Sequence, residues 1–157
     1  MLEARRLDTI EPAFGLEAAT RLLTAAMAPW VRDLGLRVEA VDAVRPPGAS
    51  ADWQPGAVLR LPLSHRICRD DGVVCTQAMA ALAEAAMTIA VAAAWNRHRP
   101  MNPIDQTVHF LRPATFDVIA DARIVRAGRT TCFGRITLSS ALDKRPVGMV
   151  ASACALL

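Results

Sequence analysis

The chain has 157 residues, which suits one domain, and 53% of them are hydrophobic, which is enough for a well-buried core. Its net charge of +3 includes no run of Lys and Arg, and aromatic residues make up only 4% of the chain, with no Tyr. Because nucleic-acid binding relies on basic stripes and stacking aromatics, the composition argues against it. The small basic excess suits a small polyanionic ligand, such as a nucleotide-bearing cofactor.

The cysteines and the N-terminal residues favour a reducing compartment. No CxxC pair occurs, and no signal-peptide pattern opens the chain, so we expect reduced thiols and a cytoplasmic protein. Disorder is expected only in the first dozen residues and in segment 46–56, which holds three prolines and two glycines. The four cysteines are Cys68, Cys75, Cys132 and Cys154.

The first predicted element is an amphipathic helix over residues 16–30, with Pro12 before it and Pro29 near its end. Its apolar face should lie on something larger. We assign residues 1–33 to an N-terminal segment that carries this helix, and residues 34–157 to the main domain. The predicted apolar face consists of Leu16, Ala19, Leu23, Met27 and Trp30.

Two strands are predicted next. Residues 34–44 alternate between apolar and polar side chains, and the alternation slips near Val41, which indicates a β-bulge. Residues 57–63 alternate again, with Leu59, Leu61 and Leu63 on one side. A charged loop, 66–72, then leads to the longest element of the chain.

The alanine-rich segment 76–95 is predicted to form a helix about 30 Å long. Because it is apolar nearly all round, it should be enclosed by other elements. The apolar stretch 73–95 has the length of a membrane span. However, Glu84 at its centre would cost several kcal/mol in a bilayer, which favours a helix buried in a soluble fold.

The chain finishes with four predicted strands, 104–111, 118–126, 131–142 and 147–157, with tight turns at 127–128 and 143–144. Two strands, a long helix and four strands make an α+β order. One antiparallel sheet wrapped around the single central helix satisfies every element. The sheet covers only one side of the helix, so we expect a second subunit to cover the other.

The central helix gathers its polar side chains on one stripe. At about 100° per residue, Gln77 lies roughly 20° from Glu84, and Thr88 lies roughly 40° away on the other side. Thr88 could hydrogen-bond the Glu84 carboxylate directly or through a water, and desolvation would raise the pKa of that carboxyl group. The free N–H groups at residues 75–77 suit developing negative charge, so this helix could serve attack on a carbonyl. Alternatively, Glu84 pairs with an arginine from elsewhere and only fixes the register of the helix.

Two stretches resemble the hotdog-fold acyl-CoA thioesterases of the phenylacetate-degradation type. Residues 71–87 look like the glycine-started helix of this family, whose motif ends in an acidic residue. Residues 105–114, which end in Leu-Arg-Pro-Ala, look like its strand, with the following hairpin at 122–129. The likeness covers about residue 34 to the C-terminus. It implies a hotdog fold, acyl-CoA hydrolysis with CoA as part of the substrate and no retained cofactor, and a homodimer or a dimer of dimers (a homotetramer).

The resemblance also implies roles for individual residues. Glu84 matches the general base or nucleophile, the N–H groups of Thr76 and Gln77 would hold the oxyanion, and Thr88 would hold the attacking water. Residues implied to bind substrate are Cys75 at the helix start, Asn102 or Asp105 from a partner subunit, and Arg112, Arg126 and Arg129 toward pantetheine and phosphates. No metal is implied, and His65, His98 and His109 do not fall at ligand spacing.

The sequence departs from the family at the helix start, where Cys75, Thr76 and Gln77 stand in place of His-Gly-Gly. A branched residue there narrows the approach to the backbone. A non-catalytic acyl-CoA-binding protein therefore stays open as an alternative. The other alternative is an acyl-thioester hydratase or dehydratase of the same fold, which would need a histidine beside the carboxylate.

Overall fold

The computed structural model describes residues 12–157, so the disorder expected for the first dozen residues falls, apart from Pro12, outside the described range. Within that range, one antiparallel sheet has the strand order β1-β2-β4-β5-β6-β3. The strands are β1 (Arg37–Asp42), β2 (Gly56–Leu61), β3 (Met101–Phe110), β4 (Val118–Ala127), β5 (Thr131–Ser140) and β6 (Pro146–Leu156). The helices are α1 (Leu16–Ala26), α2 (Pro29–Arg32) and α3 (Thr76–Ala94), with a short 3-10 turn η1 (His65–Ile67).

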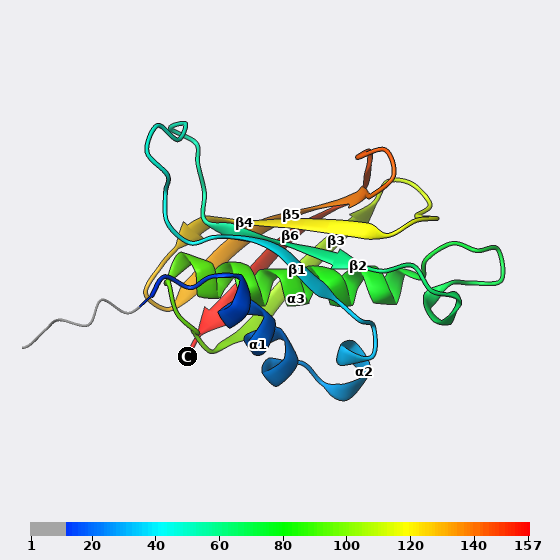
Figure 1. Cartoon of the computed structure of the whole chain (residues 1–157), viewed down its shortest axis with the longest axis horizontal. Coiled ribbons are helices and arrows are strands. Elements are labelled where there is room, and N and C mark those ends of the chain that lie inside the picture. The colour runs from blue at the N-terminus through cyan, green and yellow to red at the C-terminus, as the bar shows by residue number, and fades with distance from the viewer. Residues whose placement is uncertain (1–11) are drawn as a thin grey trace, which may run out of the picture.

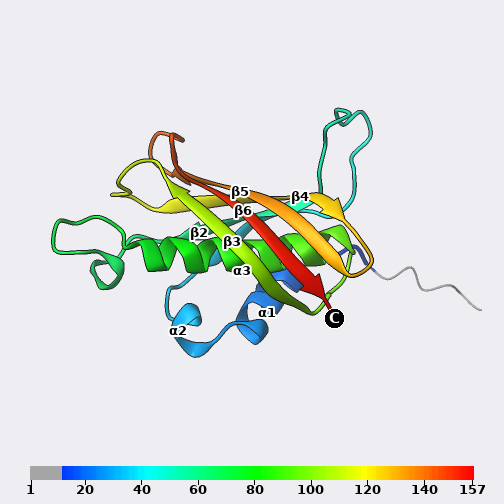
Figure 2. The ribbon, with the colours of Figure 1, turned by 180° about the vertical axis from the view of Figure 1, so that it is seen from behind.

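The predicted α+β architecture is confirmed. Figure 1 shows the sheet along one side of α3, with α1 and α2 on the opposite side of that helix. Strands β4, β5 and β6 form the predicted meander, and β3 returns to the outer edge beside β6. Figure 2 shows this edge from behind, with β3 next to β6.

Helix α3 is a core helix. By length and composition it could cross a membrane, but 72% of its apolar window is buried inside the protein, as is usual for the core helix of a folded domain. Its C-terminus closes with a Schellman motif: the Asn96 N–H donates to the Ala93 carbonyl and the Arg97 N–H to the Ala92 carbonyl, both at 3.0 Å. Asn96 takes the left-handed conformation (φ 53°) that this motif requires.

The sheet grips α3 through buried apolar side chains of its central strands. Gly134 in β5 permits a close approach, because a Cβ atom there would lie 2.4 Å from the sulfur of Met87 in α3. The buried sheet residues that form this surface include Leu59, Leu61, Val118, Ala120, Ile136 and Leu138.

The N-terminal helix differs from its prediction. The helix expected over 16–30 is interrupted, because Ala28 precedes a proline and therefore takes an extended conformation (ψ 153°), and Met27 is extended as well. Pro29 then opens the short α2. Leu16 and Trp30, which were expected on the apolar face, are 50% and 58% exposed. The buried face consists of Ala19, Leu22 and Leu23, and these pack into the same core as α3.

Several strand details also differ from expectation, among them the bounds of β1, which spans residues 37–42 instead of 34–44. The bulge of β1 lies between Val38 and Ala40 rather than near Val41. Strand β2 ends at Leu61, so Leu63 lies outside it and is 41% exposed. Strand β3 begins three residues earlier than expected and includes Pro103, which an edge strand tolerates beside its bulge.

Segment 46–56 was expected to be disordered. Its residues 46–55 belong to an irregular loop that joins β1 to β2 and projects from the sheet (Figure 1), and Gly56 begins β2. The Arg45 guanidinium donates to the carbonyls of Ala49 and Ser50 at 3.1 and 2.8 Å. These bonds hold the loop backbone in place of secondary structure.

Candidate functional site

A cavity of about 770 Å³ lies beside α3, on the side that the sheet leaves uncovered. It is bordered by α3, by the α1–α2 connection, and by the loop and first residues that lead into β3, and it is open to solvent on its remaining side. The polar residues of the α3 stripe, Gln77, Glu84 and Thr88, all line it. The other lining residues are Ala26, Met27, Ala28, Trp30, Val31, Ala80, Ala81, Ala85, His98, Arg99, Pro100, Met101, Asn102, Pro103 and Gln106.

The Glu84 side chain is exposed in the single chain. No Lys, Arg or His nitrogen of residues 12–157 lies within 4.0 Å of its carboxylate, so the arginine pairing considered above is not found there. The expected desolvation is not found within one subunit either. Glu84 thus presents to the cavity a carboxylate that has no ion-pair partner among the described residues.

Thr88 follows Glu84 by one helical turn. Its hydroxyl donates to the backbone carbonyl of Glu84 at 3.1 Å, a common bond for a threonine within a helix. The expected direct bond between Thr88 and the Glu84 carboxylate is therefore absent, and the water-mediated alternative stays a prediction. The hydroxyl oxygen keeps its acceptor capacity toward the cavity.

The start of α3 presents free backbone donors. Cys75 is the N-cap residue without a side-chain cap, and the first helical bond runs from the Met79 N–H to its carbonyl (3.4 Å). The N–H groups of Thr76, Gln77 and Ala78 therefore have no partner within the helix. Gln77 lines the cavity, whereas Thr76 is exposed outside it.

Two backbone bonds fix the position of this helix start. The Val74 N–H donates to the carbonyl of Ala114 at 2.8 Å, and the Cys75 N–H donates to the carbonyl of Ile67 at 2.8 Å. Cys75 itself is half-buried and does not line the cavity. The entry to α3 is thus pinned between η1 and the segment after β3.

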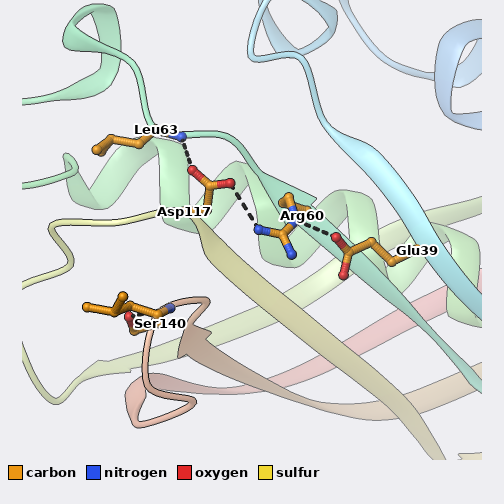
Figure 3. A network of polar contacts seen from close by, with 6 residues as sticks. Glu39, Arg60, Leu63, Asp117 and Ser140 are labelled. Carbon is orange, nitrogen blue, oxygen red and sulfur yellow. Dashed lines mark hydrogen bonds and ion pairs between the residues drawn. The ribbon is translucent and has the colours of Figure 1, made fainter.

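A polar network anchors the loop that leads to this helix start (Figure 3). The Asp117 carboxylate accepts the Leu63 N–H at 2.8 Å and the Arg60 guanidinium at 3.0 Å. Arg60 also pairs with Glu39 of β1. The Leu63 N–H lowers the pKa of Asp117, burial opposes this effect, and Arg60 adds a smaller lowering. The network joins β1, β2 and the start of β4 where the loop begins.

Sequence reasoning missed Gln106 of β3. Its side-chain amide donates to the Ala80 carbonyl of α3 at 3.2 Å, and its side chain lines the cavity. This bond holds the edge strand against the helix beside Glu84. A polar residue at an inward-facing position of β3 was the available signal. His98, Arg99 and Trp30 were also missed as lining residues.

The residues expected to bind substrate do not gather at one place within the chain. Asn102 lines the cavity. Asp105 faces away from it and lines a depression on the outer face of the sheet. Arg112 is exposed after β3, whereas Arg126 and Arg129 are exposed at the opposite end of the sheet, near the hairpin of β4 and β5. Among residues 12–157, no three His, Cys, Asp or Glu side chains cluster as a metal site would require.

Comparison with known proteins identifies a family and a fold. The sequence profile of the thioesterase superfamily matches residues 66–146. No curated protein matches the chain significantly. A protein from Pseudomonas aeruginosa has a similar structure at 26% identity, with a TM-score of 0.74 over 90% of this chain and 98% of that one. The thioesterase HI1161 from Haemophilus influenzae gives 20% identity and a TM-score of 0.73, over 93% and 92% of the two chains. Zebrafish thioesterase superfamily member 2 is 18% identical, with a TM-score of 0.71 over 90% of this chain and 98% of that one.

Proposed function

The chain belongs to the thioesterase superfamily, and from this premise we propose that it hydrolyses acyl-CoA thioesters with Glu84 as the working carboxylate. The observation that carries the proposal is the cavity beside α3. It combines a carboxylate, Glu84, with the Gln77 helix start and the Thr88 hydroxyl along one wall. A carboxylate and backbone donors on one wall suit attack on a thioester carbonyl.

The proposed reaction follows from the direction of α3. Glu84 lies seven residues beyond Gln77, about 10 Å along the helix axis, and helical side chains lean toward the N-terminus. A carbonyl oxygen that accepts the Thr76 and Gln77 N–H groups lies beside the start of α3, and the proposal directs its carbon toward Glu84. Water, held by Thr88 and deprotonated by Glu84, adds to this carbon. The tetrahedral oxyanion collapses, the C–S bond breaks, and the CoA thiolate leaves and takes up the proton.

Direct attack by Glu84 is the other route to the same products. The carboxylate oxygen would add to the thioester carbon and expel the CoA thiolate, leaving a mixed anhydride on Glu84. Water would then hydrolyse the anhydride and restore the carboxylate. Both routes need Glu84 and the helix-start amides, so the role of the cavity is the same in each.

The remaining walls suit the acyl group. Trp30, Met27 and Val31 supply a mainly apolar side contributed by the N-terminal helices, and α3 opposes them with alanines at 80, 81 and 85. Aromatic, short-chain and medium-chain acyl groups all belong to the proposal. The phenylacetate-degradation type is part of it on the strength of the sequence resemblance described above.

We further propose that the protein works in the cytoplasm as a homo-oligomer, a dimer or a dimer of dimers, with CoA entering only as part of the substrate. The exposure of Glu84 in one subunit supports the oligomer. A second copy that covered this side of α3 would desolvate the carboxylate and make it a stronger base. The partner would also supply the remaining wall of the cavity.

His98 favours a second candidate function. It lines the same cavity as Glu84, although it is not within 4.0 Å of the carboxylate. A histidine and a carboxylate in one cavity could serve a hydratase or dehydratase of acyl thioesters.

The test measures both activities on the purified full-length protein. Thiol release is followed for a panel of aromatic, short-chain and medium-chain acyl-CoAs, and hydration of 2-enoyl-CoAs is followed by the loss of their ultraviolet absorbance. The proposal expects thiol release without hydration. Hydration without thiol release would replace it with the hydratase function, and binding without either reaction would favour the acyl-CoA-binding protein.

A further inference from the structure

One arginine in the cavity lacks the partners that its position demands. Among the described residues 12–157, the Nε atom of Arg99 is the only side-chain nitrogen or oxygen that is buried without a hydrogen-bond partner. No carboxylate of these residues lies within 4.0 Å of its guanidinium. A guanidinium stays charged at all ordinary pH values, so an unsatisfied, partly buried one is costly unless an anion binds it.

The placement of Arg99 ties it to the thioester site. Arg99 and its neighbour His98 lie on the loop between α3 and β3, and both line the cavity that contains Glu84. The stretch of α3 that lines this cavity, from Gln77 to Thr88, is about 16 Å long. The two basic residues come from beyond its C-terminal end, whereas the helix-start amides lie at the other end.

Negative and positive charges therefore lie at different places along the cavity. Glu84 is negative, and Arg99 supplies a fixed positive charge with N–H groups arranged to bind two oxygens of one carboxylate or phosphate. His98 adds a further donor. An anionic group would be repelled from Glu84 and attracted to Arg99, so a substrate with one anionic end would enter in a single orientation.

We propose that Arg99 and His98 form an anion-binding subsite of the thioester site, which takes an anionic oxygen group of the substrate. This inference rests on the proposed function. Two parts of an acyl-CoA carry such chemistry: a carboxylate at the far end of the acyl group, and the phosphates of CoA. Arg99 is the specificity-determining residue for whichever of them it binds.

The test compares Arg99→Gln with Arg97→Gln, a matched control two residues away that is exposed and does not line the cavity. Substrates are succinyl and butyryl thioesters, which differ by a terminal carboxylate, each carried on CoA or on N-acetylcysteamine, which has no phosphate. Arg99→Gln should raise KM about tenfold for the substrates that carry the recognised group. Arg97→Gln should leave KM within twofold of wild type.

The pattern across substrates identifies the group. A rise in KM that is confined to the succinyl thioesters, on both carriers, identifies an acyl carboxylate as the group that Arg99 binds. A rise in KM for both CoA esters, with the KM of the N-acetylcysteamine esters unchanged, identifies a CoA phosphate. If Arg99→Gln and Arg97→Gln have the same KM for all four substrates, the inference is overturned and the hydrolase proposal is unaffected.

Further measurements distinguish a loss of anion binding from misfolding, from dissociation of the oligomer and from the absence of turnover. Circular dichroism and light scattering check that both variants fold and keep the oligomeric state of wild type. Dissociation on Arg99→Gln would overturn the inference, because the arginine would then pair with a second copy. If wild type releases no thiol, calorimetric titration of succinyl-CoA and butyryl-CoA still tests the subsite. Equal affinities for both variants would overturn it.

Discussion

The backbone carbonyl of Ala114 accepts a hydrogen bond of 2.8 Å from the N–H of Val74, two residues before α3 begins. This bond joins the two stretches that carry the family resemblance: the Leu-Arg-Pro-Ala sequence at 111–114 and the glycine-started helix. Both residues are only 2% exposed. The strand-end motif therefore holds the helix whose first N–H groups we propose as the oxyanion site.

Replacing Val74 with proline tests this relationship, because proline has no N–H to donate to Ala114. The matched control is Val74→Ala, which keeps the N–H and removes most of the buried side chain. We expect Val74→Pro to lower the free energy of unfolding by about 1–3 kcal/mol more than Val74→Ala, and to lower kcat more as well. Urea denaturation and thiol-release assays measure both effects. Equal stability and activity of the two variants would show that the bond does not position α3.

Gln106 offers a second test, since its amide holds β3 against the Ala80 carbonyl beside Glu84. Gln106→Met keeps the length of the side chain and removes the donor. The free energy of unfolding should fall by about 1 kcal/mol, and kcat/KM should fall roughly tenfold because the cavity wall shifts. Thr107→Val, at an exposed position next to it, is the control. Unchanged kcat/KM in Gln106→Met would contradict a positioning role.

Asp117 predicts a pH dependence of stability. Its pKa is lowered below the usual value of about 3.9, chiefly by the Leu63 N–H. A lowered folded-state pKa stabilises the protein above the unfolded-state pKa, and this contribution is lost as pH falls through the folded-state pKa. Asp117→Asn should therefore cost about 1 kcal/mol at pH 7, and the difference from wild type should shrink below about pH 4.

Urea denaturation at pH 7 and at pH 3 measures this difference, with the exposed Asp70→Asn as a control that should show none at either pH. A cost of Asp117→Asn that is the same at both pH values would mean that the network in Figure 3 does not depend on the charge of Asp117.

The sequence was sufficient to predict the fold because its strongest signals are local. The alanine-rich helix and the alternating strands need no distant contact to be recognised. The polar stripe of α3 was predictable for the same reason, since helical spacing alone places Gln77, Glu84 and Thr88 on one cavity wall.

One error is local and the others lie where tertiary packing decides the structure. Helical spacing placed Trp30 on a buried face, but the proline after Ala28 redirected the chain and left the tryptophan exposed beside the cavity. The strand pattern marks Gln106 as a polar residue facing inward, but nothing local identifies its partner, the Ala80 carbonyl 26 positions away. The buried Nε of Arg99 depends in the same way on how the loop after α3 folds back.

The central claim is that Glu84 performs the chemistry, and steady-state thiol release from the best acyl-CoA substrate tests it most directly. Glu84→Gln is compared with wild type and with Glu17→Gln, because the Glu17 carboxylate pairs with Arg21 on the exposed face of α1. Circular dichroism confirms that all three proteins fold. The account predicts that kcat falls about a hundredfold or more in Glu84→Gln and stays near wild type in Glu17→Gln. Turnover by Glu84→Gln within a few-fold of wild type would contradict it.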